Sequence, residues 1–368
     1  MRRAVVVVPT YNEAGNIEKI IPQVFQATAG ITNWEFHILV VDSNSPDKTA
    51  YIVKKLTSKY PRLHLLRVEK EGLGKAYTQG FNYAIDKFSP FLLFEIDADL
   101  SHDPLLIPKF IKEIEQGADL VIGSRYIKDG SIPKNWAIHR KIFSVVGNII
   151  VRLGFMKLNI TDWTGGYRAI KSWIIKNSVP FIKNYHGYVY QIALLDRAIK
   201  SGARISQIPI RFKDRKIGKS KINTGQFILN IFAYIFFNSS FIKFSSVGFI
   251  GFFIDFGISY LFIERLKSAV WLGTLFSTET AIISNFWLNN SWSFSHKKLE
   301  NSLRLMLPSF LKFNLVSSGS ILIQTLGIQL AVNFFGKKLW YFYKIVVIVF
   351  IVIPYSYILY NKFVWKEK

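Results

Sequence analysis

The stretch Phe94-Glu-Ile-Asp-Ala-Asp-Leu-Ser-His-Asp-Pro104 decides the fold of this chain. An apolar run from Phe91 to Ile96 predicts a buried strand, and the strand ends in two carboxylates, Asp97 and Asp99. Side chains two apart on an extended backbone point the same way, so both acids would lie at the carboxyl edge of a sheet, where open α/β sheets bind ligands. Two carboxylates at this spacing suit Mg²⁺ or Mn²⁺, which takes its other ligands from water and a diphosphate. For the pair taken alone, a solvated turn at the strand end is the alternative.

Outward from this stretch, short apolar runs alternate with helical stretches. The predicted strands are 4–8, 36–41, 63–68, 91–96 and 120–122, and the predicted helices are 16–28, 48–59, 75–88 and 104–116. This alternation is typical of an α/β fold with a Rossmann-like, mostly parallel sheet and helices on both faces.

Composition limits the classes of function. The 368 residues allow two or three domains, and 50% of them are hydrophobic. The absence of cysteine excludes disulfides and thiolate metal sites. The net charge of +23 fits an anionic lipid or a phosphorylated substrate, whereas no zinc-finger, RNP-like or basic-helix pattern supports nucleic acid as a partner. The apolar run after Met1-Arg2-Arg3 is too short for a signal peptide, so we expect a cytosolic N-terminus.

Polar residues follow the first two predicted strands. Pro9-Thr10-Tyr11-Asn12-Glu13 comes after the first strand and Asp42 after the second, and such strand ends converge on one crevice. They are candidate nucleotide contacts, with helix capping by Asn12 and Asp42 as the alternative. Gly72-Leu73-Gly74 is a loop before a helix and a weak indication of a phosphate site.

From Val5 to Ile222 the chain resembles the polyprenyl-phosphate (dolichyl-phosphate) mannose synthases, family 2 glycosyltransferases with the GT-A fold. The matching motifs occur in the family's order: Pro9 to Glu13, Asp42 with Ser45-Pro46-Asp47, Gly72 to Gly74, Asp97 to Pro104, Gly123 to Tyr126, Asp162 with Thr164 to Arg168, Gly187 to Gln191, and Asp214-Arg215 with Lys221.

The resemblance implies a role for each matched residue. The catalytic residues would be Asp97, Asp99, Arg125 and Arg215. The metal would be held by Asp97, Asp99 and Ser101, with His102 as a packing or capping residue. The nucleotide sugar would be held by Pro9, Tyr11, Glu13, Val41, Asp42, Asp97, Ala98, Asp99, Arg125, Arg215 and Lys221. The acceptor phosphate would be held by Arg125, Arg140, Ser144, Asp162 and Arg168.

Two departures from the family pattern affect specificity. Many relatives carry a second Asp where this chain has Ser43, so the contacts to the base are less defined. Where relatives often carry an acid after the Tyr-Gln motif, this chain has Ala193, which removes any role of that acid in holding sugar or acceptor.

The implied reaction is transfer of mannose from GDP-mannose to a polyprenyl or dolichyl phosphate. The acceptor is already an oxyanion at neutral pH, so it needs no general base, and attack opposite the leaving diphosphate inverts configuration. The protein must supply charge, from a metal on the leaving group and cations on the acceptor. The basic run Arg211 to Lys221 predicts a mobile phosphate-clamping loop, and Asp162 is expected to orient an acceptor-binding arginine. For any single arginine, a surface ion pair is the alternative.

The last third of the chain is apolar. The short run Phe227 to Phe237, in a linker at 223–240, predicts an interfacial helix, with a cytosolic core helix as the alternative. Domain 241–368 contains four predicted spans, 244–263, 269–288, 311–335 and 339–360. Lys243-Phe244 recurs as Lys312-Phe313, which indicates two hairpins in the same orientation.

Basic residues between the hairpins and after the last span predict that both termini and the catalytic domain face the cytosol. Asp255 lies within the first span and is expected to have a function or a partner inside the bundle, with simple helix packing as the alternative. This half resembles the GtrA-like four-helix domain through Phe244 to Gly248, Asp255, and Phe286 to Phe294. It could also mediate homo-oligomers in the membrane lipid.

Three other functions compete with the leading one. The same chemistry could use UDP-glucose or another UDP-sugar. A lipid-sugar translocator or anchoring protein is the alternative from another class. A processive polysaccharide synthase would carry a Gln-x-x-Arg-Trp motif, which the sequence lacks.

Overall fold

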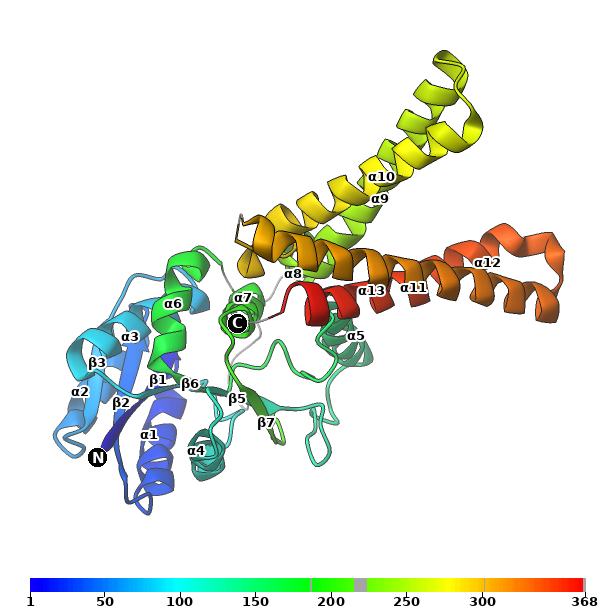
Figure 1. Ribbon diagram of the computed structural model, residues 1–368. Coiled ribbons are helices and arrows are strands. Elements are labelled where there is room, and N and C mark those ends of the chain that lie inside the picture. The colour runs from blue at the N-terminus through cyan, green and yellow to red at the C-terminus, as the bar shows by residue number, and fades with distance from the viewer. Residues whose placement is uncertain (186, 215–223, 301, 367–368) are drawn as a thin grey trace. The chain divides into compact units, whose positions relative to one another are not determined.

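The computed structural model of the chain describes residues 1–185, 187–214, 224–300 and 302–366 (Figure 1). Contacts divide the chain into two compact units, Met1–Tyr234 and Ile235–Lys368. The first unit is an α/β domain and the second is helical.

A seven-stranded sheet forms the centre of the first unit, in the order β3-β2-β1-β4-β6-β5-β7. Strand β6 runs antiparallel to both of its neighbours, and the other pairs are parallel, as the mostly parallel prediction requires. The strands are β1 (Arg2–Thr10), β2 (Trp34–Asp42), β3 (Leu63–Arg67), β4 (Leu92–Glu95), β5 (Leu120–Ser124), β6 (Arg168–Lys171) and β7 (Ile205–Pro209).

Helices cover both faces of this sheet, which explains the unbroken apolar run of β1. Val6 and Val8 face a core that contains Ile17 of α1 and Phe110 of α4. On the other face, α3 approaches so closely that a Cβ on Gly80 would lie 2.9 Å from the Val7 side chain. The helices predicted from sequence are α1 (Ala14–Thr28), α2 (Thr49–Thr57), α3 (Leu73–Phe88), and a 3-10 turn, η1 (Pro104–Leu106), that leads into α4 (Ile107–Glu115).

The second half of this unit contains elements that the sequence pattern did not predict. Besides β6 and β7 these are α5 (Ile138–Phe155), α6 (Ser172–Ile182) and α7 (Gly187–Lys200). Helix α8 (Thr224–Asn238) begins in this unit, where the Tyr234 hydroxyl donates to the buried Asp196 carboxylate at 2.9 Å. This contact ties α8 at Tyr234 to α7.

The second unit contains two helical hairpins (Figure 1). The first pairs α9 (Ser240–Tyr260) with α10 (Val270–Leu288), and the second pairs α11 (Leu303–Phe335) with α12 (Trp340–Val347) and α13 (Ile353–Leu359). Within the described residues, three helical stretches are long and apolar enough to cross a membrane: Ser240–Arg265, Arg304–Phe335 and Phe342–Val364. The remaining predicted span forms α10, which is made more polar by Glu279 and several hydroxyl side chains. The arrangement with four spans stays a prediction.

An aromatic cluster joins the two hairpins where both end. Phe313 stacks on Tyr360 at 4.5 Å between ring centroids, and Phe294 stacks on Trp365 at 4.5 Å. The indole nitrogen of the buried Trp365 also donates to the Asn290 side-chain oxygen at 3.0 Å. The two repeated phenylalanines, Phe244 and Phe313, both contact Tyr360 in this cluster.

Candidate active site

The two acids of the opening stretch follow directly from the end of β4. Asp97 and Asp99 are both half-exposed, while Ala98 between them is buried. The chain then turns sharply, with Leu100 in the left-handed region at φ 62°. This turn brings the Ser101 N–H to 3.0 Å from the Asp99 carboxylate. The acids therefore lie at the carboxyl edge of the sheet.

The donor atoms here fit a hard divalent cation. The Ser101 hydroxyl is buried, and within the described chain its oxygen has no hydrogen-bond partner. Gly166 faces Asp97, and a Cβ built on it would lie 3.9 Å from both Asp97 oxygens, so the glycine leaves room beside that carboxylate. The described residues contain no group of three His, Cys, Asp or Glu side chains able to hold a metal. Two carboxylates and one hydroxyl suit Mg²⁺ or Mn²⁺, which keeps water and phosphate oxygens as its other ligands.

His102 packs behind these acids. Its ring stacks on Tyr167 with 5.1 Å between centroids and meets Phe212 edge-on at 5.4 Å. Its Nδ1 accepts the Asp97 N–H at 3.3 Å. Burial lowers the pKa of His102 to about 4, so the imidazole is neutral at pH 7. This geometry matches a packing and capping residue.

Asp42 organises the turn at the ends of β1 and β2. Its carboxylate is fully buried, where one oxygen accepts from the Thr10 hydroxyl at 2.9 Å and from the Ser45 hydroxyl at 2.6 Å. The other oxygen accepts the Ser45 N–H at 3.0 Å. Asp42 thus shapes the loop in the way expected of a cap, and in this conformation its side chain has no exposed surface for a ligand.

The loop of the first motif is tied to the loop after β2. The Glu13 N–H donates to the Thr49 hydroxyl and the Ala14 N–H donates to Asp47, each at 3.0 Å. The Lys70 ammonium lies 3.8 Å from the centre of the Tyr11 ring. The structure therefore brings together, at neighbouring strand ends, the predicted nucleotide residues Pro9, Tyr11, Glu13, Val41 and Asp42.

The most constrained pair in the site is Arg125 with Asp162, which come from the segments after β5 and before β6. The guanidinium donates from Nε and Nη2 to the two carboxylate oxygens, both at 2.7 Å. The Arg125 N–H donates to the same carboxylate at 3.1 Å, and Nη2 also donates to the Thr164 hydroxyl at 2.9 Å. Burial disfavours the ionised carboxyl, but the Arg125 charge prevails and holds the pKa of Asp162 below its ordinary value. Asp162 is thus a charged anchor for Arg125.

Two further predicted acceptor residues lie one turn apart on α5, on the same side of the helix. Arg140 stacks over Trp136 at 3.8 Å and pairs with Asp214 at 3.4 Å. Ser144 shares a hydrogen bond with the hydroxyl of Tyr126, the residue after Arg125. The structure thus places Arg140 and Ser144 on the Arg125 side of the site.

Arg168 differs from these residues because its side chain is completely buried. Its Nη1 and Nη2 donate to the backbone carbonyls of Gln191 at 2.8 Å and Trp163 at 2.9 Å. Its cross-strand neighbour on β4 is Glu95, which is also fully buried. The assignment of Arg168 to the acceptor phosphate is not supported by this placement, because a ligand cannot reach a guanidinium without exposed surface.

Glu95 is the residue that the sequence interpretation missed. Burial raises the pKa of Glu95 to about 7, against the opposing charge of Arg168. A single acid inside the apolar run 91–96 was the available signal. Two residues that the sequence assigned to the site, Arg215 and Lys221, lie outside the described residues.

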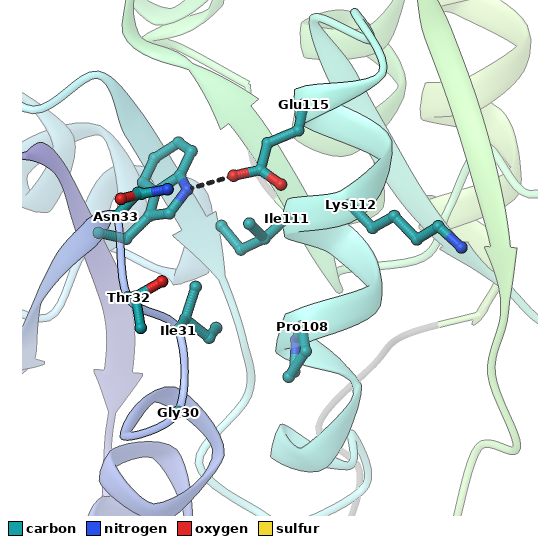
Figure 2. Close-up of a pocket in the computed structure, with 9 residues that line it drawn as sticks. Gly30, Ile31, Thr32, Asn33, Pro108, Ile111, Lys112 and Glu115 are labelled. Atoms are coloured by element: carbon teal, nitrogen blue, oxygen red, sulfur yellow. Dashed lines mark hydrogen bonds between the residues drawn. The ribbon is translucent and has the colours of Figure 1, made fainter.

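A separate pocket lies away from these groups (Figure 2). It has a volume of about 250 Å³ and lies between the loop 30–34 and α4. The Trp34 indole donates to Glu115 there at 2.9 Å. Trp34 begins β2, so this pocket is at the opposite edge of the sheet from the two acids.

Comparison with known proteins matches each half of the chain to a family. Residues 5–178 match the family described as glycosyl transferase family 2. Residues 243–365 match the GtrA/DPMS transmembrane domain.

The alignment with this chain covers most of the length of three curated relatives. A polyprenol monophosphomannose synthase of Mycolicibacterium smegmatis is 36% identical over 60% of this chain and 82% of the relative. A dolichol-phosphate mannosyltransferase of Pyrococcus furiosus is 31% identical over 78% of this chain and 80% of the relative. An undecaprenyl-phosphate mannosyltransferase of Micrococcus luteus is 34% identical over 61% of this chain and 88% of the relative.

Among solved structures, the chain is similar to glucosyl-3-phosphoglycerate synthase of Mycobacterium tuberculosis in complex with Mn²⁺, UDP and phosphoglyceric acid. The identity is 19% and the TM-score 0.49, over 64% of this chain and 78% of the other.

Proposed function

This chain belongs to the polyprenyl-phosphate mannose synthases of glycosyltransferase family 2, and from that premise we propose that it transfers mannose from GDP-mannose to a polyprenyl or dolichyl phosphate. One observation carries the proposal. Two half-exposed carboxylates, Asp97 and Asp99, share the carboxyl edge of the sheet with an arginine held in a fixed orientation, Arg125.

The donor would bind at the ends of β1, β2 and β4. Asp97, Asp99 and Ser101 would hold Mg²⁺ or Mn²⁺, which when bound supplies positive charge to the departing diphosphate. The loop that begins at Pro9 and the turn organised by Asp42 would receive the nucleoside. Because Asp42 is buried, its contribution is to shape this turn.

The acceptor phosphate would bind between Arg125 and α5. Asp162 holds Arg125 in one orientation through two hydrogen bonds, which fixes the position of a positive charge that would attract the phosphate. Arg140 and Ser144 would add a second charge and a hydroxyl from α5. Since the phosphate is already an oxyanion, no residue needs to remove a proton, and Asp162 acts by orienting Arg125.

Helix α5 also fits the apolar part of such an acceptor. It carries a row of large apolar side chains that are more than one third exposed. Basic residues, among them Lys141 and Arg152, flank that row. An amphipathic helix of this kind suits the surface of a membrane, where the phosphate of a polyprenyl lipid lies. The exposed apolar residues are Ile138, Ile142, Phe143, Val145, Val146, Ile149 and Leu153.

The chain is a membrane protein, since it contains the GtrA/DPMS domain and apolar helices of spanning length. We place the catalytic unit and both termini in the cytosol. This orientation rests on the basic residues between and after the hairpins, which favour the cytosolic side: Lys297, Lys298, Arg304, Lys362 and Lys366.

The test is transfer by the purified protein to polyprenyl phosphate with Mg²⁺ or Mn²⁺ and a panel of labelled sugar nucleotides. The proposal predicts lipid-linked product from GDP-mannose. Product from UDP-glucose or another UDP-sugar alone would contradict the donor assignment. No transfer from any donor would contradict the enzyme assignment and favour a translocating or anchoring role.

A further inference from the structure

We infer that Glu95, together with Arg168, positions the two halves of the site relative to each other: the edge formed by Asp97 and Asp99, and the anchored pair of Asp162 with Arg125. The inference rests on the proposed function, because it assigns a role within that reaction. Neither residue touches a substrate, since both are completely buried. Both are therefore positioning residues.

Glu95 is connected to the donor side through its own strand. It is the last residue of β4, and the chain leads directly from it to Asp97 and Asp99, two and four residues further on. In the sheet it lies opposite Val7 of β1 on one side and Arg168 of β6 on the other. Any shift of Glu95 would move the two acids with it.

Arg168 connects this strand to the acceptor side. It donates to the Trp163 carbonyl, one residue after the Asp162 that holds Arg125. It also donates to the Gln191 carbonyl and thereby fixes the position of helix α7. One buried guanidinium thus sets the position of two backbone segments that contribute to the site.

The cost of burying this pair argues for a role beyond stability. Within the described part of the chain, neither Glu95 oxygen nor the Arg168 Nε has a hydrogen-bond partner. The Gln191 side chain approaches the Glu95 carboxylate without reaching hydrogen-bond geometry. Buried polar atoms without hydrogen-bond partners destabilise a fold, and an apolar residue in place of Glu95 would avoid this cost. Such exceptions concentrate at functional sites.

Buried tyrosines connect Glu95 to the glycine loop before α3. Tyr77 and Tyr190 stack with 6.3 Å between their centroids, and a Cβ on Gly74 would lie 3.0 Å from the Tyr190 ring. Both tyrosines interact electrostatically with Glu95, and Tyr77 also interacts with Asp97 and Asp99. Tyr77 and Tyr190 therefore connect Glu95 and the two acids to the glycine loop.

The experiment compares Glu95→Gln, which keeps the shape of the side chain, with wild type and a control. Three quantities are measured: the turnover of mannosyl transfer, calorimetric binding of GDP with Mn²⁺, and the melting temperature. We expect turnover to fall at least about tenfold, because small misplacements of reacting groups are costly. GDP affinity should stay within about threefold, since Asp97 and Asp99 remain. The fraction of donor hydrolysed instead of transferred should rise.

The matched control is Glu35→Gln, which removes a half-buried carboxylate from the start of β2, where it pairs with Arg3 and Arg62. It should leave turnover unchanged. Should Glu95→Gln lose its folded state, Glu95→Asp and Arg168→Lys are measured in the same way. Arg168→Lys keeps the charge but cannot donate to both carbonyls in the same geometry.

The outcomes separate this inference from the proposed function. Wild-type turnover in Glu95→Gln, or a loss of turnover that merely follows the loss of folded protein in all three variants, would overturn the positioning role while leaving the enzyme assignment intact. Wild-type protein that neither binds GDP nor transfers mannose would contradict the proposed function itself.

Discussion

Arg125 and Asp162 form a buried bidentate ion pair, with both guanidinium-to-carboxylate hydrogen bonds at 2.7 Å. The pair connects the segment after β5 to the one before β6, and a third hydrogen bond from the Arg125 backbone strengthens the connection. An arginine held in this way presents a fixed charge where the acceptor phosphate is proposed to bind. Removal of the carboxylate should therefore affect both stability and turnover.

Asp162→Asn tests this relationship. The variant leaves the Arg125 guanidinium buried beside a neutral amide, a change that costs about 3–5 kcal/mol in comparable buried pairs. Turnover of the folded fraction should fall roughly a hundredfold, because Arg125 loses its orientation. The measurements are urea unfolding and transfer rates on protein that is folded by circular dichroism. Asp119→Asn is the control, since Asp119 pairs with Lys171 on a more exposed part of the sheet. Equal effects of both variants would contradict the anchoring role.

Thr10→Val tests the turn that Asp42 organises. The substitution removes one of the hydrogen bonds to the buried carboxylate and should lower the free energy of unfolding by about 1 kcal/mol. Because the turn shapes the proposed nucleoside site, the donor KM should rise several-fold while kcat changes little. Steady-state kinetics with varied GDP-mannose measure both. A fall in kcat at unchanged donor KM would contradict this division of roles.

The first strands were predictable because each is a continuous apolar run, as expected for a parallel sheet covered on both faces. Strand β6 was not predictable, since it has four residues and begins with a charged one, Arg168. Burial of that charge depends on Glu95 and the Gln191 carbonyl, which are distant in sequence, and on the nearby Trp163 carbonyl. The closeness of the motif residues in space was predictable, because the carboxyl ends of parallel strands lie at the same edge of a sheet. The sequence also predicted that Asp162 orients an arginine, whereas only the structure identifies Arg125.

A pair of histidines should make the stability of the catalytic unit depend on pH. The rings of His37 and His64 lie with nitrogens 3.0 Å apart between β2 and β3. Burial, and then the charges of His37 and Lys87, lower the pKa of His64 to about 4 from 6.5. In this range the unfolded chain binds a proton that the folded chain does not, so stability falls as the pH decreases from 6.5 toward about 4. His64→Gln should reduce this dependence in urea unfolding followed at several pH values, and the remaining slope comes from His102, whose pKa burial also lowers to about 4. The exposed His139→Gln should leave the slope unchanged, and a His64→Gln slope equal to that of wild type would refute the assignment.

Trp365→Phe tests the junction of the two hairpins. The substitution keeps an aromatic ring against Phe294 but removes the hydrogen bond to Asn290. Trp365 and Asn290 are both buried. The loss of this bond should lower stability in detergent by about 1–2 kcal/mol, which thermal unfolding of the purified protein would detect. Trp292→Phe is the matched control, because Trp292 is 42% exposed. If both variants have the melting temperature of wild type, the aromatic cluster does not stabilise the junction of the two hairpins.

The central claim is that Asp97 and Asp99 hold a divalent cation that neutralises the leaving diphosphate. The most direct measurement is the initial rate of mannosyl transfer from GDP-mannose to polyprenyl phosphate, with Mn²⁺ or with EDTA, for wild type and Asp99→Asn. We predict that EDTA abolishes the wild-type rate, that Mn²⁺ restores it, and that Asp99→Asn lowers it at least about a hundredfold at any Mn²⁺ concentration. Transfer that persists in EDTA, or a folded Asp99→Asn variant with wild-type turnover, would contradict the claim.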